Sequence, residues 1–379
     1  MWTFSRQGST LVAASRSAAG AGGIARVVRL TALSLAASGN SVRVLSALEA
    51  RGDTIPGIPG RAAGGRRERF VARLALESLG ASRVIYDHAG LARAHMPLPG
   101  RPFAVWMHGV EVWGKGLTPG RAEALKRADL VLVNSPYTLR RFEAEHWPLP
   151  QARVCLLGTE ARGEDPVPRR DPASPEAPVA LVVGRIDRDE MRKGHLEAVA
   201  AWPAVVDRVP GARLVVVGSG DGFGIFRQIV DASPARRSID ILGHVPEEDM
   251  PRLWARANVY VQPSRKEGFG IAYAEAMRHG VPVIASVHDA GAHVNVDGET
   301  GLNVDLAEGE DRLAEAIVAI LSDPARAAAM GAAGRARWRR HFTFESFSRR
   351  LLATLADHGR AGGDSAATPA RERMPESVG

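Results

Sequence analysis

Short apolar runs of strand length alternate with amphipathic helical patterns along most of the chain. In the first half the predicted strands are residues 10–14, 42–45, 84–86, 103–107 and 130–133. In the second half they are residues 179–183, 214–217, 239–242, 259–261 and 281–285, and the predicted helices are 196–207, 250–256, 269–279 and 311–322. Buried strands that alternate with helices are typical of a parallel α/β sheet. The pattern therefore predicts an α/β protein with two doubly wound domains.

A proline-rich segment separates the two sets of elements. Residues 161–178 hold five prolines and no apolar period, which is typical of a linker. We predict an N-terminal domain at 1–160 and a C-terminal domain at 179–344. A last amphipathic helix is predicted at 345–358, and the tail 359–379, rich in Gly, Ala, Arg and Ser, is predicted to be disordered.

Composition narrows the class of protein. The chain has 379 residues, of which 24% are charged and 45% apolar, as in an ordinary globular protein large enough for two cores. Cys155 is the only cysteine, so disulfides and multi-cysteine zinc sites are excluded and a packed thiol is expected. No apolar run reaches the length of about 18 residues that a membrane span needs, and the N-terminal run is too short for a signal peptide. We therefore predict a cytoplasmic protein.

The net charge of +7 is unevenly distributed. Residues 1–165 carry 22 basic and 13 acidic side chains, and the remainder carry 27 and 29. This asymmetry is compatible with nucleic acid, an anionic membrane or an anionic substrate. Only four of the 49 basic residues are lysines, namely Lys115, Lys126, Lys193 and Lys266. Arginine occupies nearly all cationic positions of this chain. A lysine inside a motif therefore indicates a position where lysine itself is needed.

A glycine-rich turn follows the first predicted strand. Gly20-Ala21-Gly22-Gly23-Ile24-Ala25 begins a helix, and glycines there let an anionic ligand approach backbone N–H groups. The string also satisfies the dinucleotide pattern G-x-G-x-x-A, with Glu49 near the place of a ribose-binding acid. Three interpretations stay open: a dinucleotide site, a different phosphate or sugar loop, and a tight turn.

A pair of cations follows the strand at 179–183. Arg185 and Lys193 lie eight positions apart at the carboxyl edge of the second predicted sheet. An arginine can form two parallel bonds to phosphate oxygens, and a lysine acts as a point charge. Together they predict a diphosphate site.

Two carboxylates flank a glycine-containing helix start in the same domain. Glu267 lies in the predicted loop and Glu275 lies two helical turns into the helix, again eight positions apart. One carboxylate can bind sugar hydroxyls, the helix start can bind phosphate, and the second carboxylate can bind a ribose diol. The segment therefore predicts a nucleotide-sugar site.

Taken together, these motifs resemble those of a retaining nucleotide-sugar glycosyltransferase of family 4, the glycosyl transferases group 1. The resemblance covers about residues 8–345 and is carried mainly by GRIDRDEMRKG (184–194) and EGFGIAYAEAMRHGVPVIAS (267–286). AGAGGIARVVRL (19–30) is similar to the glycine loop of the family, and VWMHGVEVWG (105–114) to its histidine-containing strand end. The resemblance implies the GT-B architecture, two Rossmann-like doubly wound domains facing across a cleft.

The resemblance also implies a role for each matched residue. Arg185 and Lys193 would neutralise the diphosphate leaving group. Glu267 would hold hydroxyls of the transferred sugar, and His108 would approach that sugar from the opposite domain. The implied donor-binding residues are Glu275 at the ribose, the N–H groups of Gly270 and Ile271 at the phosphates, the turn of Gly22 and Gly23, and the backbone of Gly243, His244 and Val245 at the base.

The chemistry implied by the resemblance is transfer of a sugar from a UDP-, GDP- or other nucleotide-sugar donor to an acceptor hydroxyl, with retention of anomeric configuration. Such a reaction needs no protein nucleophile. No cofactor is expected, because Arg185 and Lys193 already supply the positive charge of a metal. The triplet Asp187-Arg188-Asp189 mimics a D-x-D metal motif but is predicted not to bind one. A glycan, lipid-linked or small-molecule acceptor stays open, as in polysaccharide, glycolipid or glycoconjugate biosynthesis.

One departure from the family pattern concerns His293. Family members often place a glutamate near this position. The neighbouring Asp297-Gly298 and Thr300-Gly301 do match. The departure leaves the exact donor-side contacts open and does not affect the predicted fold.

Three other functions remain as alternatives. An NAD-dependent oxidoreductase could use the glycine turn, but it leaves the motifs of the second domain unexplained. A nucleic-acid binder is suggested by the arginines of 335–340, yet the aromatic content is only 6%, so no nucleic-acid partner is expected. A nucleotide-sugar epimerase of the same architecture would consume donor without an acceptor.

A basic segment of the first domain suggests contact with an anionic membrane. Arg66, Arg67, Arg69 and Arg73 cluster in a predicted helix, and Phe70, Leu74 and Leu79 are expected elsewhere on its surface. Each cation close to such a membrane contributes about 1 kcal/mol. We therefore expect peripheral association with the inner face of the cytoplasmic membrane.

Overall fold

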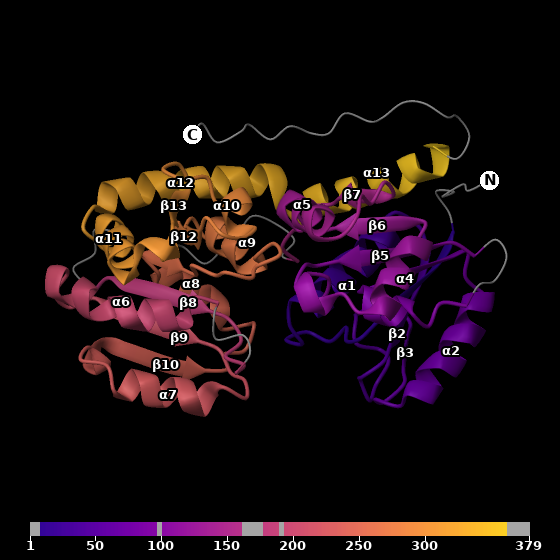
Figure 1. Ribbon diagram of the computed structural model, residues 1–379, viewed down its shortest axis with the longest axis horizontal. Helices are drawn as coiled ribbons and strands as arrows, with labels where there is room; N and C mark the ends of the chain where they lie inside the picture. Colours follow the sequence, from indigo (N-terminus) through magenta and orange to yellow (C-terminus); the bar gives the residue numbers. More distant parts are fainter. Residues whose placement is uncertain (1–7, 97–100, 161–176, 189–192, 362–379) are drawn as a thin grey trace.

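The structure is a computed structural model and describes residues 8–96, 101–160, 177–188 and 193–361. The predicted linker, apart from its last two residues, and the predicted tail beyond Ala361 lie outside the described residues. Figure 1 shows two lobes, one coloured indigo to magenta and the other pink to orange, with one long helix along each at the end of the described chain.

The first lobe is built on a seven-stranded parallel sheet with the order β3-β2-β1-β4-β5-β6-β7. Its strands are β1 (Ser9–Ala14), β2 (Ser41–Ser46), β3 (Gly60–Ala62), β4 (Arg83–Tyr86), β5 (Phe103–Met107), β6 (Leu130–Val133) and β7 (Ala152–Val154). Its helices are α1 (Gly23–Ala37), α2 (Arg67–Leu79), α3 (Ala89–Ala92), α4 (Pro119–Arg127) and α5 (Pro136–Glu145). Because β1 pairs with both β2 and β4, the strand order reverses beside β1.

The second lobe repeats this plan with a six-stranded parallel sheet in the order β10-β9-β8-β11-β12-β13. Its strands are β8 (Val179–Val183), β9 (Arg213–Val217), β10 (Ile239–Gly243), β11 (Val259–Val261), β12 (Val283–Ser286) and β13 (Gly301–Val304). Its helices are α6 (His195–Arg208), α7 (Phe223–Asp231), α8 (Met250–Arg256), α9 (Ile271–Arg278), α10 (Gly291–Val294) and α11 (Glu310–Leu321). The prediction of two doubly wound domains is confirmed.

Both faces of each sheet are buried, which explains the continuous apolar runs of the strands. In β1, Leu11 and Ala13 pack on the face covered by α2 and α4, whereas Val12 and Ala14 pack on the face covered by α1. Ligands of such sheets bind beyond the carboxyl ends of the strands, where the strand order reverses. A ligand site is therefore expected at the carboxyl ends of the strands beside β1 and β8.

Two long helices at the end of the described chain join the lobes. α12 (Pro324–His341) packs against α9 of the second lobe, and α13 (Phe344–Ala361) packs against α1 of the first (Figure 1). Phe342, between them, is fully buried, and one apolar core cluster includes residues of both lobes. The two domains therefore share part of their core.

Several predicted boundaries differ from the structure for local reasons. The helix predicted at 269–279 starts at Ile271, because Gly270 has a φ of +84° and caps its N-terminus. The strand predicted at 281–285 starts at Val283, because the N–H of Val281 bonds to Ala276 in the turn after α9. The last helix runs to Ala361, three residues beyond its predicted end.

No single helix among the described residues is both long and apolar enough to cross a membrane. One bent pair, Asp311–Leu321 with Pro324–His358, passes that test by length and composition alone, with a bend of 95°.

Candidate active site

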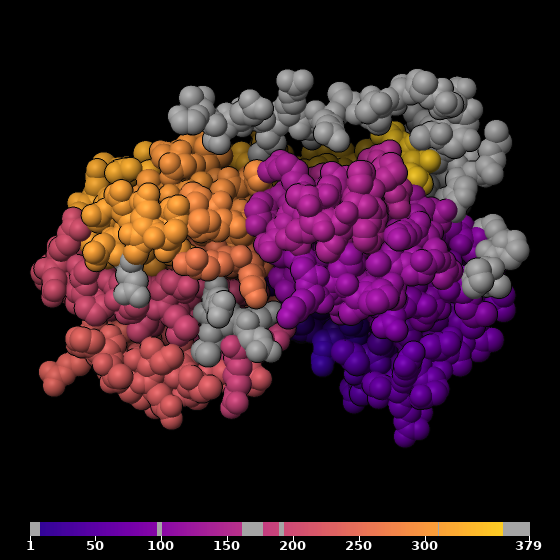
Figure 2. Space-filling model, in the orientation of Figure 1, coloured from indigo at the N-terminus to yellow at the C-terminus, as the bar shows by residue number. Residues whose placement is uncertain are grey.

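A cleft with a volume of about 1010 Å³ lies between the two lobes. In Figure 2 the lobes are separated by a notch at the lower edge of the view. The loops after β1, β5 and β6 line the cleft from the first lobe, and those after β8, β9, β10 and β11 line it from the second. The cleft thus lies where the carboxyl ends of both sheets face each other, as the strand order requires.

The cleft brings together nearly all residues that the sequence singled out. Its lining includes Gly22, Gly23, His108, Arg185, Lys193, His244, Val245, Glu267, Gly270, Ile271 and Glu275. Gly243 is not part of the lining, and its carbonyl accepts a hydrogen bond from the N–H of Gly218 at 2.8 Å. The individual roles assigned to these residues stay predictions.

The two cations predicted to bind diphosphate differ in their surroundings. Arg185 has a side chain that is 64% exposed and pairs with the carboxylate of Asp187. Lys193 is less exposed, at 25%, and its Nζ lies 4.0 Å from Oε2 of Glu267. Lys266, which the sequence analysis did not single out for a role, also lines the cleft. The second lobe therefore contributes Arg185, Lys193 and Lys266 to the lining, and the first two are paired with carboxylates.

Glu267 is held in place by buried groups beneath it. Its Oε2 accepts a hydrogen bond from Nε2 of Gln262 at 3.2 Å, and its backbone N–H donates to Oδ2 of Asp289 at 2.9 Å. Burial raises the pKa of Asp289 to about 7, although the hydrogen bonds that its carboxylate accepts from backbone N–H groups lower it. Asp289 thereby fixes the backbone that carries the Glu267 carboxylate at the cleft.

The start of α9 requires a glycine. Gly270 adopts a left-handed conformation, and a Cβ there would collide with the ring of Tyr273. Ile271 is the first helical residue, so N–H groups without intrahelical partners face the cleft at this point. Such a terminus favours an anionic ligand.

His108 meets the second lobe at the same end of the cleft. Its Nε2 donates to the backbone carbonyl of Asp87 at 2.7 Å, so the neutral ring carries its acceptor lone pair on Nδ1. A Cβ on Gly268 would collide with the carbonyl of His108, and Oγ of Ser135 donates to the carbonyl of Gly268 at 2.6 Å. The close approach brings His108 next to the loop that carries Glu267.

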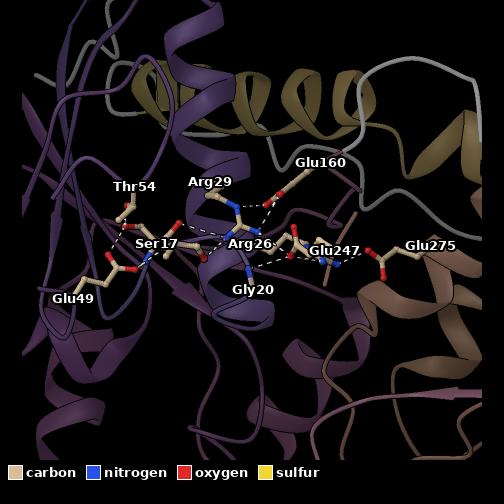
Figure 3. Close-up of polar contacts among 10 residues, drawn as sticks. Ser17, Gly20, Arg26, Arg29, Glu49, Thr54, Glu160, Glu247 and Glu275 are labelled. Carbon is tan, nitrogen blue, oxygen red and sulfur yellow. Dashed lines mark hydrogen bonds and ion pairs between the residues drawn. The ribbon is translucent and has the colours of Figure 1, made fainter. Parts of the chain in front are cut away.

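Glu49 has a role that the sequence did not reveal. Its carboxylate accepts hydrogen bonds from the N–H groups of Ser17 and Ala18 at 2.7 and 2.6 Å, as Figure 3 shows for Ser17. Burial opposes ionisation, but these bonds lower the pKa of Glu49 below its usual range. The carboxylate therefore holds the loop before the glycine turn, and it is not the ribose acid of a dinucleotide site.

Arg26 and Glu247 were missed by the sequence analysis. Arg26, in the first turn of α1, places Nη1 2.5 Å from Oε1 of Glu275 and Nη2 3.3 Å from Oε1 of Glu247. All three side chains line the cleft (Figure 3). Arg26 and Glu275 are 249 positions apart, so no local pattern could have paired them.

His293 lies outside the lining of the cleft. Its Nε2 lies 2.6 Å from Nη2 of Arg140 on α5, at a contact between the lobes. Burial, together with Arg140 and Arg337, lowers its pKa to about 4, so the ring is neutral and accepts this bond. The departure from the family pattern thus concerns an interdomain contact.

The predicted D-x-D triplet is only partly described. Asp187 lines the cleft and pairs with Arg185, and Asp189 lies outside the described residues. Within the described ranges, no group of three or more His, Cys, Asp or Glu side chains could hold a metal ion.

Solved structures share this two-domain arrangement. HepE from Anabaena, solved in complex with UDP and glucose, matches with a TM-score of 0.73 at 16% identity, over 91% of this chain and 98% of that one. Sucrose-phosphate synthase from Thermosynechococcus elongatus matches with a TM-score of 0.70 at 24% identity, over 91% and 98%. The fold is that of the GT-B glycosyltransferases, as predicted.

Sequence relatives define the family. Residues 166–337 match the model of "Glycosyl transferases group 1". A GDP-mannose-dependent monoacylated alpha-(1-6)-phosphatidylinositol monomannoside mannosyltransferase from Corynebacterium glutamicum is 32% identical over 67% of this chain and 69% of its own length. A GDP-mannose-dependent alpha-(1-6)-phosphatidylinositol monomannoside mannosyltransferase from Mycobacterium tuberculosis is 33% identical over 69% of both chains.

The chain therefore belongs to the glycosyl transferases group 1 family. It is a glycosyltransferase with a nucleotide-sugar donor, as the second-domain motifs predicted. Family membership decides against the oxidoreductase, the nucleic-acid binder and the epimerase.

Proposed function

We propose that this enzyme transfers mannose from GDP-mannose to a hydroxyl of a phosphoinositide-type glycolipid, with retention of anomeric configuration. The observation that carries the proposal is the identity of 32% and 33% with two GDP-mannose-dependent mannosyltransferases over about two thirds of the chain. The cleft fits such a donor, because cations, a helix N-terminus and two carboxylates follow one another along its second-domain wall.

The proposed reaction exchanges one bond at the anomeric carbon. The bond between that carbon and the donor phosphate oxygen breaks, and a bond to the acceptor oxygen forms on the same face of the sugar. The proton of the acceptor hydroxyl passes to the departing phosphate. No protein nucleophile takes part, so the chain has to bind, orient and stabilise charge.

Five side chains of the cleft have a part in this scheme. Arg185 and Lys193 stabilise the charge that develops on the leaving diphosphate, together with the start of α9. Glu267 and His108 hold hydroxyls of the mannose from opposite domains. Glu275 binds the ribose diol of the nucleotide.

The test is a transfer assay with labelled GDP-mannose and a phosphatidylinositol monomannoside acceptor. We expect labelled lipid, an α-anomeric linkage by NMR of the product, and much slower transfer from UDP-glucose. Transfer that uses UDP-glucose in preference, or a product of inverted configuration, would contradict the proposal.

We also propose that transfer needs no metal cofactor. Lys193, Arg185 and the start of α9 supply positive potential where a metal would act. The enzyme should keep its rate in excess EDTA. Loss of activity that magnesium or manganese restores would instead assign a metal role to Asp187 or Asp189.

We further propose that α2 docks on an anionic membrane to reach a lipid acceptor. Arg66, Arg67 and Arg69 are exposed at its start. Contrary to the prediction, Phe70 and Leu74 are buried in the core, because they face the sheet. The apolar side chains on the outer surface are Val71, Leu76 and Leu79, which are 39%, 69% and 58% exposed.

Sedimentation with vesicles tests this proposal. The enzyme should pellet with phosphatidylglycerol vesicles at low salt and be released at high salt, since exposed charges are screened. The variant Leu76→Ser/Leu79→Ser should bind less, whereas Ile225→Ser on α7 of the other lobe should bind as the parent does. Equal pelleting with neutral vesicles, or none with either, would contradict it.

A further inference from the structure

The Glu275 carboxylate is oriented by the opposite domain. Among the residues that the structure describes, its one side-chain hydrogen bond comes from Nη1 of Arg26, at 2.5 Å. Glu275 belongs to α9 of the second lobe and Arg26 to the first turn of α1 in the first lobe. The contact therefore crosses the cleft (Figure 3).

The same guanidinium also reaches the loop after β10. Nη2 of Arg26 lies 3.3 Å from Oε1 of Glu247, and this oxygen accepts the backbone N–H of Gly20 at 3.1 Å. Gly20 begins the glycine turn of the first lobe, whereas Glu247 follows His244 and Val245 of the second. Arg26 thus links the ribose carboxylate, the loop expected to meet the base, and the glycine turn.

The surroundings of Arg26 are polar and largely buried, and its side chain is 21% exposed. Glu160 binds the neighbouring Arg29 through both carboxylate oxygens, at 2.8 and 3.0 Å, and Nη1 of Arg29 donates to the carbonyl of Ala18 at 2.5 Å. The negative charge of Glu275 raises the pKa of Arg26 above its usual range, and Glu160 and Glu247 raise it further. Burial lowers the pKa but does not outweigh these carboxylates. The guanidinium is therefore charged and paired with two carboxylates, Glu275 and Glu247.

The contact leaves room for a ribose on the same carboxylate. A carboxylate has about four lone-pair sites, and Arg26 uses one of them on Oε1. The Glu275 side chain is still 25% exposed and lines the cleft. A ribose diol can therefore bind while Arg26 stays in place.

We propose that Arg26 is a positioning residue for the donor nucleotide: from the first domain it orients Glu275 toward the ribose diol and holds Glu247 beside the base. The nucleoside end of the donor site is then built from both domains. This inference rests on the proposed function, in which Glu275 binds the ribose.

A double-mutant cycle tests it. The parent enzyme, Arg26→Met, Glu275→Gln and the double variant are titrated calorimetrically with GDP and, because it carries the same ribose, with UDP. We expect Arg26→Met to weaken GDP binding about tenfold when it is introduced into the parent enzyme. Introduced into the Glu275→Gln variant, it should weaken GDP binding less than about twofold, because the two side chains act through one contact.

Kinetics and controls separate positioning from a structural role. Arg26→Met should raise the donor KM about tenfold and leave kcat and the acceptor KM nearly unchanged. Arg26→Lys keeps the charge but cannot bind two carboxylates through separate guanidinium nitrogens, so it should lose less GDP affinity than Arg26→Met. It also serves as the test variant if Arg26→Met does not fold. Arg43→Met, which breaks an ion pair with Glu77 outside the cleft, should not change GDP affinity.

Three outcomes would overturn the inference. Additive effects of the two substitutions would show that Arg26 does not act through Glu275. Tighter GDP binding by Arg26→Met would show that the arginine competes with the ribose. Unchanged affinity in Glu275→Gln would remove the ribose assignment of the proposed function and the inference with it, whereas additivity alone leaves the proposed function intact.

Discussion

At the scale of single residues, Lys193 and Arg185 stand at the carboxyl edge of the second sheet, where a leaving diphosphate would lie. Lys193 is close to Glu267, and Arg185 is held by Asp187. Both cations are therefore paired with carboxylates of the same lobe before any donor binds. Their effect should therefore appear in the rate of transfer more than in stability.

We expect Lys193→Ala and Arg185→Ala each to lower kcat about a hundredfold or more, because a preorganised charge aimed at a developing anion contributes about 3 to 4 kcal/mol to transition-state stabilisation. Transfer kinetics measure the change in kcat, and thermal unfolding measures any change in stability. Arg188→Ala, at an exposed position of the same loop outside the cleft lining, is the matched control and should keep the parent rate. Near-normal rates in both variants would remove the diphosphate assignment.

The two glutamates should separate in binding experiments. Glu275→Gln should weaken both GDP and intact donor, because the ribose is common to them. Glu267→Gln should weaken the intact donor and leave GDP affinity unchanged, because the sugar is absent from GDP. Calorimetric titration of both ligands checks this. The reverse pattern would exchange the two assignments and with them the orientation of the donor.

The sequence could predict which residues line the cleft but not how they pair. Local motifs identified Glu267 and Glu275 because their spacing follows from a loop and a helix. The contact of Arg26 with Glu275 joins segments 249 positions apart, so no spacing carries it. Glu49 satisfied the spacing of a ribose acid, and only its N–H partners show that it supports a loop.

At the scale of elements, strongly apolar strands were predicted to within a few residues, whereas short edge strands were missed. β3 and β7 have three residues each, and β3, β7 and β13 lie at sheet edges. Each of these three strands contains at most two apolar residues, so the apolar run that identifies a longer strand is absent. α12 was not predicted as an element, and only the arginines of 335–340 within it were noted, because its small residues carry little apolar signal.

Helix α13 should contribute strongly to stability. Phe347 is fully buried against the first lobe and stacks on Trp106, with ring centroids 6.1 Å apart. Phe347→Ala should lower the free energy of unfolding by about 3 to 5 kcal/mol. Urea denaturation measures it, with Ala353→Ser at an exposed position of the same helix as the control. Similar losses in both variants would show that α13 does not join the core as described.

The contact of α5 with α10 should weaken in acid. The pKa of His293 is lowered to about 4, so its neutral form is favoured in the folded state and the contribution to stability is lost as the pH falls from about 6.5 to about 4. Thermal unfolding across this range should show a smaller acid loss in His293→Gln than in the parent. Other histidines with lowered pKa values, such as His95 and His279, titrate in both proteins and cancel in the comparison. Equal acid losses would contradict this assignment.

At the scale of the whole molecule, the two domains are joined by a shared core and by polar contacts across the cleft. Phe342 and Phe347 belong to an apolar cluster that includes both sheets. Ser135 and Tyr137 of the first lobe donate to carbonyls of Gly268 and His288 of the second. Residues that meet one ligand therefore come from segments distant in the sequence, and only the assembled fold brings them together.

Thermal unfolding of the whole chain with a set of ligands tests whether the cleft binds a nucleotide sugar. GDP-mannose, UDP-glucose, ADP-glucose and NAD are compared at equal concentration, in the parent and in Lys193→Ala. A ligand at a hundredfold excess over its Kd stabilises the folded state by about 2.7 kcal/mol. We expect GDP-mannose to raise Tm most and the increase to shrink in Lys193→Ala. An increase with NAD and none with any nucleotide sugar would contradict a nucleotide-sugar site in the cleft.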